Sequence, residues 1–321
     1  MMSTITNSGQ RTLYVAIATI TMAACQQQPA SQPPAAGAAP ATAATHSTPE
    51  ARAAEKQRMT NLGIEHKTAR ALYEHLKQQA QGGKALTWQT VPDWTGVWTR
   101  EASPLFWDPD QASPTALPTA KLTPEYSKRL MAKLEKVNSG IEFDPLSNCE
   151  PAGMPRWMVE PFLREWAVTP QETYLVNEMQ NEMRRVYTDG RDHPSAEDAY
   201  PLWEGDSIGF WDGNKLVIHT AQMRAGQYQR IQPYYTEQVE TVEIWQKAED
   251  STMAVDIWAF DPPALAEPWY TKQTYKRLSN DDKTLRIRYW DCGENQNNTV
   301  TKTDTGSSDF TNFNFTKKGD K

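Results

Sequence analysis

The chain has 321 residues and a formal net charge of −7, with 40 acidic and 33 basic side chains. Nucleic-acid binding depends on Lys and Arg at phosphates, so this acidic balance argues against a nucleic-acid partner. The 12 Trp residues are many for this length, and such large, rigid rings favour β-structure and binding cavities.

The first 25 residues read as a targeting signal. Arg11 precedes an uncharged stretch that ends in Met22-Ala23-Ala24-Cys25. A run this short cannot cross a bilayer, which takes about 20 residues, but it fits the apolar region of a secretory signal. Small residues before a cysteine resemble the lipobox of bacterial lipoproteins, although Met22 stands where Leu is usual. The resemblance implies cleavage before Cys25 and lipidation of that residue, with palmitate among the acyl chains; an uncleaved anchor and ordinary secretion are the alternatives.

The residue after the lipidation site indicates the membrane in which a lipoprotein is anchored. Gln26 rather than Asp follows Cys25, and by analogy with other lipoproteins this favours the outer membrane. We therefore expect a lipid-anchored protein on the periplasmic side of that membrane, whose membrane contact is through the N-terminal lipid only.

A tether and helices come next. Residues 26–47 are Gln, Pro, Ala and Thr, which cannot build a core, so they predict a flexible tether. A helical segment over 48–83 begins near Pro49 and ends at Gly82-Gly83. A second, short helix starts at Thr123-Pro124-Glu125 and runs to about Val137.

Residues 84–321 are mostly strand-like. Candidate strands are 95–101, 161–169, 172–179, 182–188, 206–211, 214–220, 238–247, 252–260, 268–278 and 284–290. Asp212-Gly213 is the clearest hairpin turn, because Gly supplies a positive φ angle. Many strands joined by short loops predict an antiparallel meander, and closing it into a barrel removes exposed edges. The predicted fold is mainly β, a lipocalin-like (calycin-type) barrel with an N-terminal helix and a second short helix.

Cys149 and Cys292 are the two cysteines that follow the signal. In an oxidising periplasm an even pair suggests a disulfide, and two separate buried thiols are the alternative. The sequence has no CxxC, HExxH or EF-hand pattern and no glycine-rich phosphate loop, so it predicts neither a metal site nor a cofactor. His66 and His75 are nine residues apart on the first predicted helix, a spacing that does not place both on one metal ion.

The densest polar cluster runs from Arg184 to Pro194. A loop after a strand presents His193 and Arg191, and Tyr187 precedes them. His193 could act as a general acid or base, Tyr187 as a proton donor and Arg191 as an anion stabiliser. The alternative is a structural corner in which Arg191 pairs with an acid.

A turn at Asp212-Gly213 would place Asp206 directly opposite His219. That pair could tune a general base, or it could be a solvated ion pair between two strands.

A second carboxylate pair depends on strand register. A four-residue turn at 248–251 would set Glu243 against Asp256, and two facing carboxylates tend to share a proton. One interpretation puts the aliphatic face of these strands in the barrel core and the charged face in water. The other covers the aliphatic face with helices, and a ligand cavity is then lined by Trp245, Trp258, Trp290, Arg286 and Arg288, beside Glu243.

Three motifs stand out in the predicted β-domain: CEPAGMPR at 149–156, YTDGRDHP at 187–194 and WEGDSIGFWDG at 203–213. Together they resemble a family of secreted, uncharacterised β-rich proteins of Gram-negative bacteria. The resemblance covers about residues 94–292 and implies a secreted β-rich domain, with no catalytic role to transfer. Glu240 stands where a His is usual in that family.

These patterns predict a periplasmic lipoprotein that binds a small, partly aromatic molecule and could convert it as a lyase, isomerase or hydrolase using acid–base chemistry without a metal. The alternative is a non-catalytic envelope lipoprotein that binds a ligand or a protein partner. The substrate and the oligomeric state do not follow from the sequence.

Overall fold

Three helices flank the β-strands in the computed structural model, which describes residues 48–101, 120–140, 144–195, 197–278 and 285–292 and short strands at 301–302 and 308–309. They are α1 (Pro49–His66), α2 (Ala69–Gln79) and α3 (Pro124–Asn138). The expected short helix from Pro124 is confirmed. The signal at 1–25 with Cys25, and the tether at 26–47, lie outside the described residues.

The helical segment at 48–83 is two helices rather than one. Lys67 has a φ of 62°, a left-handed conformation that ends α1. Thr68 then begins α2, and its hydroxyl accepts a hydrogen bond from the Ala71 N–H at 3.1 Å. The break folds α2 back beside α1, and His66 and His75 come together with ring centroids 4.3 Å apart. The spacing argument assumed one continuous helix, and the break at Lys67 removes that assumption.

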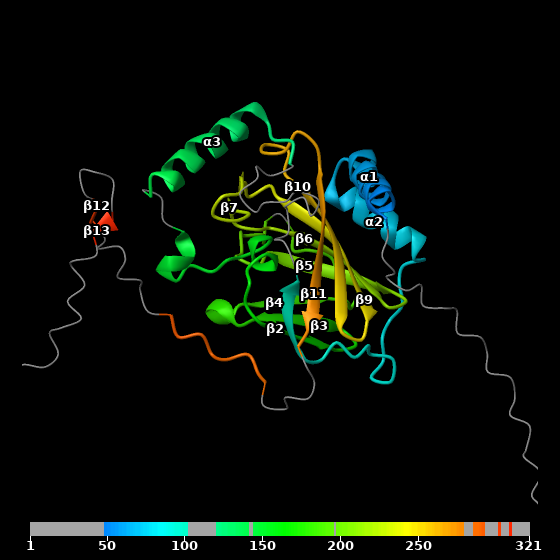
Figure 1. The fold of residues 1–321 in the computed structure, drawn as a ribbon. Coiled ribbons are helices and arrows are strands. Elements are labelled where there is room, and N and C mark those ends of the chain that lie inside the picture. The colour runs from blue at the N-terminus through cyan, green and yellow to red at the C-terminus, as the bar shows by residue number, and fades with distance from the viewer. Residues whose placement is uncertain are drawn as a thin grey trace, which may run out of the picture. The chain divides into compact units, whose positions relative to one another are not determined.

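Nine strands form a closed barrel, as predicted (Figure 1). Around the barrel they are β1 (Val97–Glu101), β2 (Arg164–Val168), β3 (Glu172–Asn177), β4 (Met183–Tyr187), β5 (Asp206–Asp212), β6 (Lys215–Ala221), β9 (Glu240–Glu249), β10 (Thr252–Phe260) and β11 (Trp269–Arg277). The barrel closes because β1 pairs with both β2 and β11. Neighbouring strands are antiparallel except β4 and β5, which are parallel.

Short elements lie outside the barrel. β7 (Gly226–Gln227) pairs with β8 (Tyr234–Tyr235), and β12 (Thr301–Lys302) pairs with β13 (Ser308–Asp309). Three 3₁₀ turns are η1 (Pro145–Asn148), η2 (Arg156–Met158) and η3 (Met179–Asn181). Of the strand expected at 284–290, the structure describes residues 285–290, and these residues form no strand.

Two hydrophobic clusters hold the described part of the chain together. One fills the barrel, where Trp98 stacks on Trp166 and Trp245 stacks on Tyr275 with centroids 4.6 and 5.7 Å apart. The other lies on the outer face, where Leu72 and Tyr73 of α2 pack with strand residues such as Val242. Several strands therefore bury both of their faces.

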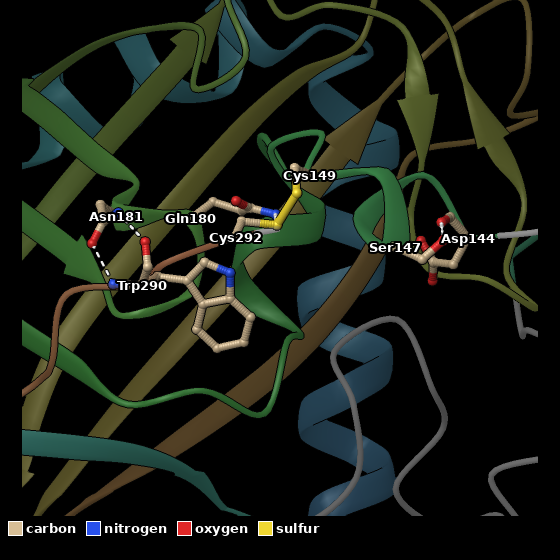
Figure 2. The surroundings of a disulfide bond; sticks show 7 residues. All are labelled: Asp144, Ser147, Cys149, Gln180, Asn181, Trp290 and Cys292. Atoms are coloured by element: carbon tan, nitrogen blue, oxygen red, sulfur yellow. Dashed lines mark hydrogen bonds between the residues drawn. A yellow bond between two sulfur atoms is a disulfide. The ribbon is translucent and has the colours of Figure 1, made fainter. Parts of the chain in front are cut away.

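The expected Cys149–Cys292 disulfide is present, with Cα atoms 5.9 Å apart (Figure 2). It joins the turn after η1 to residues 285–292. The Asn181 side chain pairs with the Trp290 backbone beside it, accepting from the N–H at 2.9 Å and donating to the carbonyl at 3.0 Å. None of the described helices is both long enough and apolar enough to cross a membrane.

Candidate functional site

The parallel pairing of β4 and β5 determines where His193 lies. Val186 pairs with Ser207, so after β4 the chain must travel back along the barrel before β5 can begin. Residues 188–205 make this return and carry His193 to the start of β5. Helix α2 holds the loop, because Arg70 donates to both carboxylate oxygens of Asp192, at 2.6 and 3.1 Å.

Four side chains from different parts of the chain then form a continuous series, which we call the histidine relay. His193 Nδ1 lies 2.5 Å from Asp206 Oδ1, and His193 Nε2 lies 2.8 Å from His219 Nδ1. His219 Nε2 lies 3.2 Å from Glu240 Oε2. The relay thus joins the return loop to β5, β6 and β9.

The number of N–H protons available for these three contacts limits what the relay can do chemically. Ionised carboxylates only accept hydrogen bonds, and each neutral imidazole supplies a single N–H. Two neutral histidines can therefore satisfy only two of the three contacts in the relay. A further proton is needed to satisfy the third.

Burial acts on the charge of His219, the more buried histidine of the relay. The His219 side chain is 3% exposed, and burial lowers the pKa of its imidazole despite the nearby Glu240. A positive charge within the relay is therefore disfavoured on His219.

Both ends of the relay reach solvent. The side chains of His193 and Asp206 are 11% and 16% exposed, and that of Glu240 is 38% exposed. Tyr73 of α2 covers the middle, with its ring centroid 5.5 Å from that of His219. The arrangement can move a proton between a partly exposed imidazole and a solvated carboxylate through a buried imidazole.

The predicted register between Asp206 and His219 was wrong. Asp212 pairs with Lys215, so the turn is Gly213-Asn214, and Asp206 faces Ala221. Asp206 and His219 are diagonal neighbours on one face of the sheet, and the His193 ring bridges them. The sequence placed both residues on one face but gave no sign that His193 lies between them.

Arg191 and Tyr187 have contacts of a different kind. Arg191 pairs with Asp189 at 2.6 Å, and its guanidinium lies 3.9 Å from the centroid of the Tyr187 ring. These contacts agree with the alternative drawn from the sequence, a structural corner in which Arg191 pairs with an acid. The structure brings Arg191 and Tyr187 together with each other rather than with the relay.

The predicted pairing of Glu243 with Asp256 was also wrong. A register shift between Thr252 and Met253 sets Glu243 opposite Ile257, and Asp256 opposite Ile244. The two carboxylates therefore lie on opposite faces of the sheet. Asp256 faces outward and accepts a hydrogen bond from the Tyr270 hydroxyl at 2.7 Å.

Glu243 lies inside the barrel with a partner that the sequence did not identify. Arg184 donates to both Glu243 oxygens at 2.8 Å, and both side chains are 0% exposed. Arg184 also donates to Thr220 and Ser207, while Thr241 and Trp245 donate to Glu243. The charge pair is thus fully hydrogen-bonded within the core.

The predicted Trp-lined cavity wall is not assembled. Trp245 is packed inside the barrel, whereas Trp258 lies outside it and donates to the Met59 carbonyl of α1 at 2.7 Å. Trp290 contacts Phe162, with ring centroids 5.1 Å apart. Arg286 and Arg288 are exposed within residues 285–292.

No cluster of three or more His, Cys, Asp or Glu in the described residues is arranged to hold a metal ion. The relay is a linear series of hydrogen bonds instead. Comparison with protein-family models and with curated proteins finds no match.

Proposed function

We propose that this chain is a lipid-anchored protein on the periplasmic side of the outer membrane that binds a small, partly aromatic molecule and changes it by acid–base chemistry. The observation that carries the chemistry is the histidine relay, whose three contacts require one proton more than two neutral imidazoles supply. The signal-like N-terminus supports the location, and the disulfide suits an oxidising compartment.

Each member of the relay has a distinct role in this proposal. To act as a general acid or base on the bound molecule, His193 must release one of its two relay contacts, because Nδ1 lies at Asp206 and Nε2 lies at His219. Asp206 orients the ring and stabilises its charged form. His219 passes the proton on to Glu240, which exchanges it with solvent. Such proton transfer serves lyase, isomerase and hydrolase reactions.

Turnover of cell metabolites by matched variants tests this function. The wild type, His193→Gln and His66→Gln would be incubated with an extract of the producing cell and compared by mass spectrometry. His66 lies outside the relay, so that control should consume the same compound as the wild type, whereas His193→Gln should not. Equal consumption by His193→Gln would overturn the proposal.

Non-catalytic ligand binding is the second candidate function. One observation favours it: α2 covers the middle of the relay, so a substrate can approach only its ends. In the same experiment, a compound retained unchanged by all three proteins would support this alternative.

A further inference from the structure

A pocket of about 470 Å³ lies outside the relay, which is within the range of small-molecule sites. It is formed by α3, the segment from η1 to η2, the residues just before β5 and the β7–β8 hairpin. Its aromatic and basic lining consists of Tyr126, Trp203, Tyr234, Tyr235, Arg129 and Arg156.

Basic side chains of the protein lie against three of these rings. The Arg129 guanidinium lies 4.7 Å from the Tyr126 centroid, and that of Arg224 lies 4.4 Å from the Trp203 centroid. Lys133 Nζ lies 4.3 Å from the Tyr234 centroid. These contacts hold the rings in place and put positive charge beside the aromatic wall.

Arg156 contributes a buried cationic group to the same wall. Its side chain is 4% exposed, and it pairs with Asp144 at 2.6 Å and with Glu160 at 2.7 Å. These bonds use Nη2 and Nε, and Nη1 has no hydrogen-bond partner among the described residues. A fixed guanidinium with a free N–H suits an acceptor oxygen on a ligand.

Acidic side chains also line the pocket, but at its exposed edge. Glu150 and Glu237 are both exposed, where solvent and salt screen their charge. Arg129 is 53% exposed and pairs with Glu125 at 2.5 Å. The buried wall therefore consists of aromatic rings and Arg156, whereas Arg129, Glu150 and Glu237 lie toward solvent.

We infer that this pocket binds a small aromatic carboxylate, with its ring against Tyr126, Trp203 and Tyr234 and its carboxylate at Arg129 and Arg156. The inference goes beyond the proposed function, because it concerns different residues and holds for a non-catalytic protein as well. Trp203 precedes Asp206 of the relay by three residues, which limits their Cα atoms to about 10 Å apart. Pocket and relay are therefore neighbours.

Binding of three ligands of the same shape tests the assignment in the full-length protein. The probes are naphthoate, the uncharged naphthamide and the cationic naphthylmethylamine, titrated by calorimetry. Naphthoate should bind saturably and at least about tenfold more tightly than naphthamide. The uncharged amide cannot form a charge-assisted hydrogen bond with the arginines as the carboxylate does. Tighter binding of the amine, or no binding of any probe, would overturn the inference.

Matched arginine variants locate the site. Arg129→Gln should weaken naphthoate binding about tenfold, and Arg129→Lys should weaken it less. Arg185→Gln is the control, because Arg185 is also half-exposed, lies over Tyr174 and pairs with Glu172, but lies outside the pocket. Equal losses in the Arg129→Gln and Arg185→Gln variants would contradict the assignment.

A relay variant separates this inference from the proposed function. His193→Gln should bind naphthoate as the wild type does, whether or not the relay is catalytic. If His193→Gln abolishes binding while Arg129→Gln does not, the carboxylate binds at the relay instead, and the pocket assignment fails.

Discussion

Arg184 and Glu243 form an ion pair that is fully buried. The pair is stable only while both charges are present, so loss of either residue should destabilise the fold. Removing one partner leaves a buried, uncompensated charge, and Arg184→Met or Glu243→Gln should each lower the free energy of unfolding by about 3–5 kcal/mol. The double variant should lose less than the sum of the two. Urea denaturation measures all three. The exposed Glu55–Arg58 pair is the control, and Arg58→Ala should cost below about 1 kcal/mol; additive losses at Arg184 and Glu243 would contradict this account.

Glu204 should make stability depend on pH. Burial, and then the nearby Glu182, raise its pKa well above 4.5, so the folded protein holds this carboxyl protonated more readily than the unfolded chain does. The resulting stabilisation is complete below the unfolded pKa and is lost as pH rises through the folded one. Glu204→Gln should therefore be more stable than the wild type at pH 8 and about equally stable at pH 4. Thermal unfolding at both values checks this, and an equal effect at both would refute it.

At the scale of elements, α2 and the return loop are joined by the Arg70–Asp192 contact. The Arg70 hydrogen bonds, and then the His193 N–H, lower the pKa of Asp192 to about 2. A lowered acid pKa stabilises the fold above the unfolded value of 3.8, and this contribution is lost as pH falls toward 2. The two side chains are 44% and 64% exposed, so the gain in stability is small.

The Arg70→Ala variant tests this contact through the titration of Asp192. The carboxyl should titrate near 2 in the wild type and move toward 3.8 in the variant, as followed by NMR chemical shifts. Arg58→Ala, on the neighbouring helix, should leave the titration unchanged. An unaltered Asp192 midpoint in Arg70→Ala would show that α2 does not hold the His193 loop.

At the scale of the whole molecule, the disulfide ties two distant segments of the chain. Cys149 and Cys292 are separated by 143 residues, so the bond restricts the unfolded chain over a long loop. Replacing both cysteines by Ser should lower the free energy of unfolding by about 2–5 kcal/mol. Denaturant unfolding of the variant, and of the wild type with reductant, should agree; an unchanged midpoint in both would refute the prediction.

Local sequence patterns determined most of the barrel strands. Alternating residues and turn signals located β2–β6 and β9–β11 to within a few residues, because side chains of a strand alternate faces wherever it pairs. Pro124 marked the start of α3, and the even cysteine pair indicated the disulfide. These features depend on residues that are close together along the chain or, for the disulfide, on the even number of cysteines after the signal.

Tertiary structure alone decided which face lies inside. Glu243 and Trp245 face the barrel interior, whereas Asp256 and Trp258 face outward, although all four follow the same alternation. A closed barrel has one core within it, and α1 and α2 make a second core outside, so an apolar face can belong to either. The register shift after Thr252 then reverses the faces relative to the predicted pairing.

The histidine relay could not be predicted from the sequence, because it too depends on how the strands pair. Its members are separated along the chain, and they meet because β4 and β5 run parallel and the loop between them must return across the barrel. The sequence supplied the residues able to transfer a proton and the strands that carry three of them. Their order, from Asp206 through His193 and His219 to Glu240, exists only once the strands are paired and α2 holds the loop in place.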